Sequence, residues 1–231
     1  MNFYKEYLKA NKEYWDKGYP AYNVDHNVFR FYGRILKPDF SYLSGGKLVD
    51  FGCGQGATVD FFNKHGYLAR GVDISENEIH IAKLRYPYIS DRFEVCDPEP
   101  ANNKFYGFER DISIVTATQT LYYLSNKDFD CCVRKFYDSM NTGGVFYATM
   151  MGEQSKEFFE NSTEYKDGLR SVAFKNDRLD IKNYFMFFIK DEKDLEKKFE
   201  MFRPLHIGYY AAKFRKDEGD CFHYTFCGIK E

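Results

Sequence analysis

The feature that most constrains the fold is the stretch KLVDFGCGQGATVDFF, residues 47–62. In it an apolar run ends in Asp50, three glycines follow at Gly52, Gly54 and Gly56, and a helix-like pattern comes next. A strand that turns into a helix through glycines lets a ligand approach the backbone at the carboxyl edge of an open α/β sheet. The spacing differs from the GxGxxG of a pyrophosphate loop, and there is no GK[ST] of a triphosphate loop. A packed turn without a ligand explains the glycines equally well.

The segment from Lys47 to Met151 alternates short β-rich runs with helical runs, as in a parallel sheet wrapped by helices. Ser75 and Glu78 have the spacing of a capping box, and Pro87 ends the helix that they begin. The predicted strands cover 47–51, 67–73, 92–97, 111–117 and 145–151, and the predicted helices cover 57–65, 77–86 and 126–140. The pattern therefore predicts an α/β fold.

The flanking segments extend this core at both ends. Residues 1–46 contain two aromatic-rich helical patterns, over 6–15 and 25–36, and we expect them to form an N-terminal helical cover. After residue 152 we expect a polar helical stretch, a β-like run over 183–189, a helix over 191–202, and β-like runs over 205–214 and 221–229 that add antiparallel strands to the sheet edge. A chain of 231 residues without repeats suits a single domain, with residues 47–231 as its main part.

The composition argues against several classes of protein. The formal net charge is −2 without a basic cluster, so nucleic acid is not an expected partner. No apolar run approaches the roughly 18 residues of a membrane span, and the first residues lack an export signal, so we expect no membrane contact and a cytoplasmic location. The alternating run CFHYTFC (Cys221, His223, Thr225, Cys227) suits a metal site or a partly buried strand, and we favour the strand, with no metal.

Three acids follow one another at the ends of successive predicted strands, Asp50, Asp73 and Asp97. The carboxyl ends of parallel strands meet at one edge of a sheet, so these carboxylates are expected to face one crevice. A carboxylate can accept hydrogen bonds from both hydroxyls of a ribose, which suits Asp73. The sequence therefore predicts a site for an adenosine derivative.

Residues 47–151 resemble the class I S-adenosylmethionine-dependent methyltransferases. The matching segments are VDFGCGQG, GVDIS, FEVCD, DISIVTATQTLYYL and NTGGVFYAT. The resemblance implies a Rossmann-like, mostly parallel sheet of seven strands with an antiparallel edge strand and helices on both faces. It also implies that the protein is an enzyme whose cofactor is S-adenosylmethionine.

The resemblance assigns the cofactor site residue by residue. It implies that Gly52, Gly54 and Gly56 line the methionine part of the cofactor, that Asp50 orients its amino group, that Asp73 binds the ribose, that Cys96 and Asp97 lie against the adenine, and that Ile74 packs on the adenine ring. Cys53 and Thr118 complete the predicted cofactor site. For Ile74 and Cys96, ordinary core packing is an equally good explanation.

The resemblance also implies that the acceptor lies over the end of the fourth strand, where the chain reads TATQTLYYL. This stretch lacks the N/D-P-P-Y/F and Pro-Cys motifs of the base methyltransferases and the acid cluster of the magnesium-dependent catechol type. A metal-free enzyme that acts on a small molecule remains. We predict that Gln119, Tyr122 and Tyr123 lie near the transferred methyl group.

A neutral alcohol acceptor needs a base, and histidine is the usual one near neutral pH. We select His26 before His206 and His223, because in the family the N-terminal helices often fold over the substrate. For each of them an ordinary surface or hydrogen-bonded histidine is the favoured interpretation, and an acceptor that is already anionic, such as a phosphate or carboxylate, needs no base. The aromatic residues Tyr14, Trp15, Tyr19 and Tyr22 either form that cover or pack on the sheet, and Arg30, Arg170 and Arg178 either hold an anionic acceptor or are solvated.

The N-terminal segment also resembles methyltransferases encoded with bacterial capsule and surface-glycan genes. This resemblance implies a small polar acceptor, such as a phosphorylated or nucleotide-activated glycan precursor, and favours O-methylation. An N-methyltransferase of a small metabolite and a cofactor-binding but catalytically silent partner subunit are the alternatives. The glycine spacing argues against a nicotinamide dehydrogenase. We expect a monomer or a homodimer.

Overall fold

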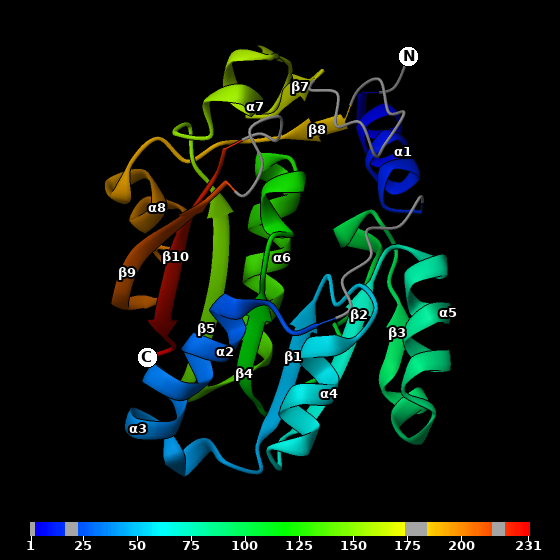
Figure 1. The fold of residues 1–231 in the computed structure, drawn as a ribbon, viewed down its shortest axis with the longest axis vertical. Coiled ribbons are helices and arrows are strands. Elements are labelled where there is room, and N and C mark those ends of the chain that lie inside the picture. The colour runs from blue at the N-terminus through cyan, green and yellow to red at the C-terminus, as the bar shows by residue number, and fades with distance from the viewer. Residues whose placement is uncertain (1–2, 17–22, 174–183, 214–219) are drawn as a thin grey trace.

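The computed structural model describes residues 3–16, 23–173, 184–213 and 220–231. Tyr19, Tyr22 and Arg178, three of the residues considered above, lie outside these ranges. A seven-stranded sheet with the strand order β3-β2-β1-β4-β5-β10-β9 forms the centre of the described structure (Figure 1). The strand order reverses between β1 and β4, which is the point where open α/β sheets bind their ligands.

The sheet is mostly parallel, which confirms the predicted fold class. Its parallel strands are β1 (Lys47–Phe51), β2 (Leu68–Asp73), β3 (Phe93–Val95), β4 (Ile112–Ala117) and β5 (Met140–Met151). At the far side, β10 (Cys221–Ile229) runs antiparallel to both β5 and the edge strand β9 (Arg203–Ala212). The two C-terminal β-like runs therefore join the main sheet, as expected.

Helices cover both faces because successive residues of a strand point to opposite sides of the sheet. Leu48 and Ile114 belong to one buried core, while their neighbours Val49 and Val115 belong to the other. The first core also contains residues of α2 (His26–Phe31), α4 (Ala57–Lys64) and α5 (Glu76–Arg85), and the second contains residues of α6 (Asn126–Ser139) and α8 (Glu192–Lys198).

The two helical segments of the expected N-terminal cover lie in different places. The helix α1 (Phe3–Asp16) lies above the end of the sheet beside β8 (Tyr184–Met186), as Figure 1 shows. The second segment continues from α2 through a π-helical stretch (Tyr32–Leu36) and α3 (Lys37–Asp39), and it packs on a face of the sheet. Of these two segments, α1 is the one that lies over the carboxyl ends of the strands.

The chain between β5 and α8 differs from its predicted form. Where a polar helical stretch was predicted after residue 152, the chain forms the short helix α7 (Lys156–Glu160) and the strands β6 (Ser162–Glu164) and β7 (Arg170–Val172). These two strands form an antiparallel sheet with β8, which lies within the β-like run predicted over 183–189. β5 also begins at Met140 instead of Val145, because Met140 already pairs with Ile112 and the ladder then shifts register before Val145 pairs with Ile114.

Asn11 fastens α1 to the rest of the molecule. Its side-chain amide donates to the carbonyls of Tyr123 and Phe185 at 2.9 Å each, and its Oδ1 accepts from the Phe185 N–H at 2.8 Å. All three contacts are with backbone groups, and Asn11 itself is buried. The Asn11 side chain therefore joins α1 to β8 through hydrogen bonds with the backbone of Phe185.

We expect Asn11→Ala to lower the free energy of unfolding by about 1–3 kcal/mol, because it leaves buried backbone groups of Phe185 without a partner. Urea denaturation measures this change, and loss of hydrogen-exchange protection in α1 locates it. Lys9→Ala is the control, since Lys9 lies on the exposed surface of the same helix. Equal effects of the two substitutions would contradict this role of Asn11.

Candidate cofactor and acceptor site

A cavity of about 1250 Å³, including the open space at its mouth, lies at the carboxyl ends of β1, β2 and β4. α1 and residues 23–25 form part of its wall opposite the sheet. The described wall contains the carboxylates of Asp25, Asp50, Asp73 and Glu78 and no lysine, arginine or histidine. The cavity is therefore suited to a ligand that is polar and carries positive charge.

The glycine loop forms the floor of the cavity. Gly52, Gly54 and Gly56 have φ angles of 71°, 49° and 83°, in the left-handed region that disfavours other residues. A Cβ on Gly56 would lie 2.6 Å from the ring of Phe93, whereas one on Gly54 would meet only Glu78, at 3.6 Å. Gly56, which was predicted to line the methionine part of the cofactor, does not belong to the described wall and is instead required for packing, while Gly54 leaves open the space that a ligand needs. Cys53, between Gly52 and Gly54, lines the same cavity.

Asp50 lies at the end of β1 with 2% of its surface exposed. The hydroxyl of Thr116 donates to its Oδ1 at 2.7 Å. Burial raises the pKa of Asp50 to about 7, and the hydrogen bond from Thr116 opposes that rise. A cation bound beside Asp50 would stabilise its charged form.

Asp73 connects the glycine loop to the turn after β2. Its Oδ2 accepts from the N–H of Gly54 and its Oδ1 from the N–H of Ser75, both at 2.9 Å. Burial raises the pKa of Asp73, and these backbone hydrogen bonds oppose the rise. A carboxylate has about four acceptor positions, so Asp73 can still bind two hydroxyls.

The capping box predicted at Ser75 and Glu78 is only half formed. The Ser75 Oγ accepts from the Glu78 N–H at 3.2 Å, but the Ser75 N–H donates to Asp73 instead of to Glu78. The freed Glu78 carboxylate lines the cavity and accepts from the Gln55 side chain at 3.4 Å. Glu78 is a site residue that the sequence analysis assigned only to a helix cap.

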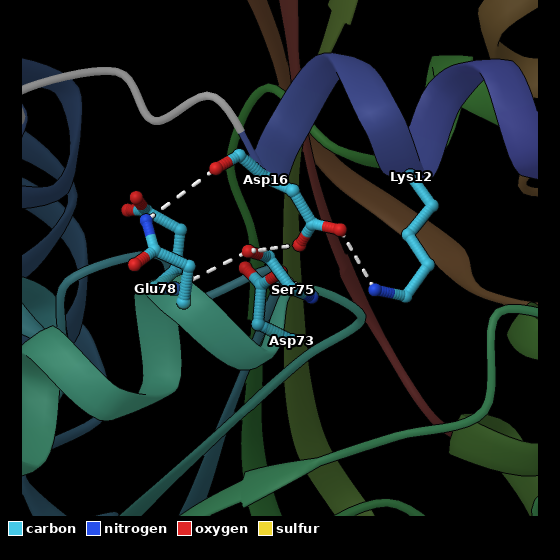
Figure 2. Close-up of polar contacts among 6 residues, drawn as sticks. Lys12, Asp16, Asp73, Ser75 and Glu78 are labelled. Atoms are coloured by element: carbon cyan, nitrogen blue, oxygen red, sulfur yellow. Dashed lines mark hydrogen bonds and ion pairs between the residues drawn. The ribbon is translucent and has the colours of Figure 1, made fainter.

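The end of α1 is tied to this turn, as Figure 2 shows. The hydroxyl of Ser75 donates to Asp16 Oδ1 at 2.8 Å, and Lys12 pairs with Asp16 Oδ2 at 2.8 Å. Asn77 adds a longer contact to the backbone carbonyl of Asp16, at 3.4 Å. The cover is thereby fixed beside Asp73, at the predicted ribose position.

The third strand end departs from the prediction. Cys96 and Ile74 line the cavity as expected, but Asp97 is exposed and does not belong to its wall. The Asp97 carboxylate accepts from the N–H of Glu99 at 2.8 Å, so it stabilises the following turn, and Pro98 lines the cavity in its place. The structure therefore brings two of the three predicted acids together.

The fourth strand leads into the end of the cavity where the acceptor was predicted. Thr118, Gln119 and Tyr123 line it, whereas Tyr122 is buried outside the wall, and its hydroxyl lies 3.3 Å from His223 Nε2. The Trp15 ring, also in the wall, meets Tyr123 edge-on at 5.1 Å. These two rings narrow the cavity on the side of α1.

The predicted histidine base does not reach the cavity. His26 is exposed at the first position of α2, while its neighbour Asp25 lines the wall. His206 is exposed on β9, and burial lowers the pKa of His223 to about 4, which keeps it neutral. The turn of the helix explains why Asp25 and not His26 lines the cavity, because the cap residue Asp25 points toward the cavity and the next residue, His26, points toward solvent.

The other predicted contacts have structural partners or lie outside the wall. Arg170 donates to Ser162 at 2.7 Å and lies over the Phe159 ring, and Arg30 is exposed. Tyr14 packs on Tyr184 at 4.4 Å and does not line the cavity. Among the described residues, no group of three or more metal-ligating side chains is arranged to hold an ion, and no helix is long and apolar enough to cross a membrane.

The fold and cavity define a class of protein, an α/β enzyme with a nucleoside-type site at its topological switch point. A family model described as a methyltransferase domain matches residues 24–199, and the chain belongs to this family. The predicted enzyme class is thereby confirmed, and the protein is a methyltransferase whose cofactor is S-adenosylmethionine. No curated protein matches the chain.

Solved structures share the fold at low sequence identity. A SAM-dependent methyltransferase from Methanosarcina mazei has a TM-score of 0.65 and 14% identity over 90% of this chain and 98% of its own. Magnesium protoporphyrin IX methyltransferase from Synechocystis with bound SAH has a TM-score of 0.60 and 13% identity over 100% and 88%. The N-methyltransferase NodS from Bradyrhizobium japonicum, in complex with S-adenosylhomocysteine, has a TM-score of 0.56 and 12% identity over 87% and 84%.

The chain's own residues fit the cofactor. The cofactor carries a sulfonium and an ammonium group, and the described wall supplies carboxylates to such charges. The open space beside Gly54 lets a ligand approach the backbone closely.

We expect Gly56→Ala mainly to lower the stability of the protein and Gly54→Ala mainly to weaken ligand binding. Left-handed strain costs each variant about 1–2 kcal/mol of unfolding free energy, and the collision with Phe93 adds about 1–3 kcal/mol in Gly56→Ala alone. Gly54→Ala should instead weaken the binding of S-adenosylhomocysteine, because its methyl group occupies ligand space. Thermal unfolding and calorimetry measure the two effects, and equal stabilities would refute the assignment of Gly56 to packing.

Proposed function

We propose that this methyltransferase transfers the methyl group of S-adenosylmethionine to an oxygen of a small polar acceptor. The observation that supports this best is the single cavity wall that joins the acid-lined glycine loop to Gln119 and Tyr123 beyond β4. A cofactor held at the first end presents its methyl group toward the second. The acceptor therefore binds beside Gln119, under Trp15.

The proposed cofactor contacts follow the geometry of the loop. Asp73 binds the ribose hydroxyls, Asp50 binds the ammonium group, and Gly52 and Gly54 lie along the methionine chain. Cys96 and Ile74 pack near the adenine. Glu78 joins Asp73 on the ribose side, since its carboxylate lines the same wall.

The reaction asks mainly for alignment and a dry pocket. The cofactor, when bound, supplies an electrophilic methyl group. Attack on that carbon must be in line with the leaving sulfur, so the protein gains rate by holding the acceptor at a fixed distance and angle. Trp15 and Tyr123 exclude water from that end of the cavity, and Asn11 holds α1 in place above them.

The resemblance to capsule-associated enzymes suggests a glycan precursor as the acceptor, and an acceptor panel tests this. It contains nucleotide-linked sugars, a phosphoramidate, a small amine and a small carboxylic acid. Incubation with methyl-labelled cofactor identifies the product. Transfer to nitrogen would favour the N-methyltransferase alternative. Any transfer excludes a catalytically silent partner subunit.

We expect Asp73→Asn to weaken the binding of S-adenosylhomocysteine about 10- to 100-fold, because a charged hydrogen-bond acceptor contributes about 1.5–3 kcal/mol. Isothermal calorimetry measures this. Asp97→Asn is the matched control, since Asp97 lies outside the cavity wall, and its affinity should stay within about twofold of the wild type. Equal losses in both variants would contradict the proposed ribose contact.

Affinity for S-adenosylmethionine should fall as the pH drops below 7. The Asp50 pKa is about 7 in the free protein, so acid neutralises the partner of the ammonium group. Binding then requires loss of one proton, and the affinity falls by up to about tenfold per pH unit. Calorimetry between about pH 5.5 and 7.5 measures the slope. In Asp50→Asn the slope should be shallower, and an unchanged slope would show that another group is responsible.

A further inference from the structure

Four elements that are distant in the sequence meet at the acceptor end of the cavity. Gln119, which follows β4, donates through its backbone N–H to the Thr149 hydroxyl on β5 at 2.8 Å. Its side-chain Nε2 donates to the Tyr210 hydroxyl on β9 at 3.1 Å and to Asp25 Oδ2, ahead of α2, at 3.4 Å. Gln119 is thus held from three sides.

The backbone of Gln119 is unusual as well. Its φ angle is 53°, in the left-handed region that residues other than glycine rarely adopt. The hydrogen bonds to Thr149 and Tyr210 hold it there, because both partners are themselves fixed. Thr149 is fully buried, and the Tyr210 ring stacks on His223 at 5.0 Å with an angle of 6°. The side chain of Gln119 therefore has a defined position in the wall.

These contacts fix the orientation of the Gln119 amide. An ionised carboxylate only accepts hydrogen bonds, so the amide nitrogen must face Asp25, and Oε1 is left able to accept. Asp25 is fixed in turn, because its Oδ1 accepts from the backbone N–H of Asn27 at 2.7 Å and from its side chain at 2.8 Å. Asp25 and Gln119 both line the cavity, so this end of the site is rich in hydrogen-bond acceptors.

Given the proposed function, we infer that the methyl acceptor is a neutral hydroxyl group and that Asp25 receives its proton. A hydroxyl donates to the carboxylate and becomes more nucleophilic. An ammonium group beside Asp25 would be held in its charged form, which has no lone pair to attack with. A phosphoryl or carboxylate oxygen would meet Asp25 as a like charge.

The bonds balance in a single displacement. A lone pair of the acceptor oxygen forms a bond to the methyl carbon while the bond from that carbon to sulfur breaks. The electron pair stays on sulfur, which leaves as a neutral thioether. The hydroxyl proton passes to the carboxylate of Asp25 and then to water, and the product is a methyl ether.

The test compares Asp25→Asn with Asp39→Asn, in which the changed carboxylate is exposed on α3, away from the cavity. Asparagine is a good helix cap, so α2 should remain intact. The acceptors are glucose, a UDP-linked hexose, putrescine, phosphoramidate and glutarate, each with cofactor labelled with 13C in its methyl group. NMR of the products locates the methyl group, and calorimetry with S-adenosylhomocysteine shows that each variant is folded.

We expect methylation at a sugar hydroxyl, a kcat about 10²- to 10⁴-fold lower in Asp25→Asn, and unchanged affinity for S-adenosylhomocysteine. The inference is overturned if the methyl group is found on putrescine, phosphoramidate or glutarate, or if Asp25→Asn turns over as fast as Asp39→Asn. A wild-type protein that binds no S-adenosylhomocysteine would instead disprove the proposed cofactor contacts, which distinguishes the two failures.

Discussion

The proposed cofactor half of the site depends on one carboxylate that accepts two backbone hydrogen bonds. Asp73 holds the N–H of Gly54 on one oxygen and that of Ser75 on the other, so it joins the loop after β1 to the turn after β2. Ser75 then reaches Asp16 at the end of α1. The glycine loop, the second strand end and the covering helix thus share one polar connection, and the shape of the cavity follows from it.

Burying three carboxylates in the cavity wall costs electrostatic free energy, which a cationic ligand can offset. Burial disfavours the charged forms of Asp50, Asp73 and Glu78, and in each case a hydrogen-bond donor opposes that effect only in part. The site is therefore preorganised for positive charge before the ligand arrives. The acceptor end differs, because there Asp25 and Gln119 combine with aromatic walls.

Local patterns predicted most of the residues that line the cavity around the glycine loop, because these residues are adjacent in the sequence. The glycines, the cap at Ser75 and the acid at Asp73 all lie within one strand-turn-helix unit and its neighbour. Asp97 was predicted from its place at a strand end, but its carboxylate caps the following turn and stays outside the wall. His26 was predicted because the N-terminal helices of the family often cover the substrate. The preceding residue, Asp25, lines the wall instead, since consecutive residues at the start of α2 point in different directions. The β-like run over 183–189 contains β8, but β6 and β7 were missed because segments of three residues are too short to show a strand pattern.

The proposed acceptor half is assembled from residues 25, 119, 149 and 210, whereas most of the proposed cofactor half comes from residues 50–78. The residues of the two halves can therefore be substituted separately. Under the proposed assignment, a substitution on β9 or ahead of α2 would alter which molecule is methylated without disturbing the glycine loop. Laboratory evolution could therefore change the choice of acceptor by varying these residues while the glycine loop stays unchanged.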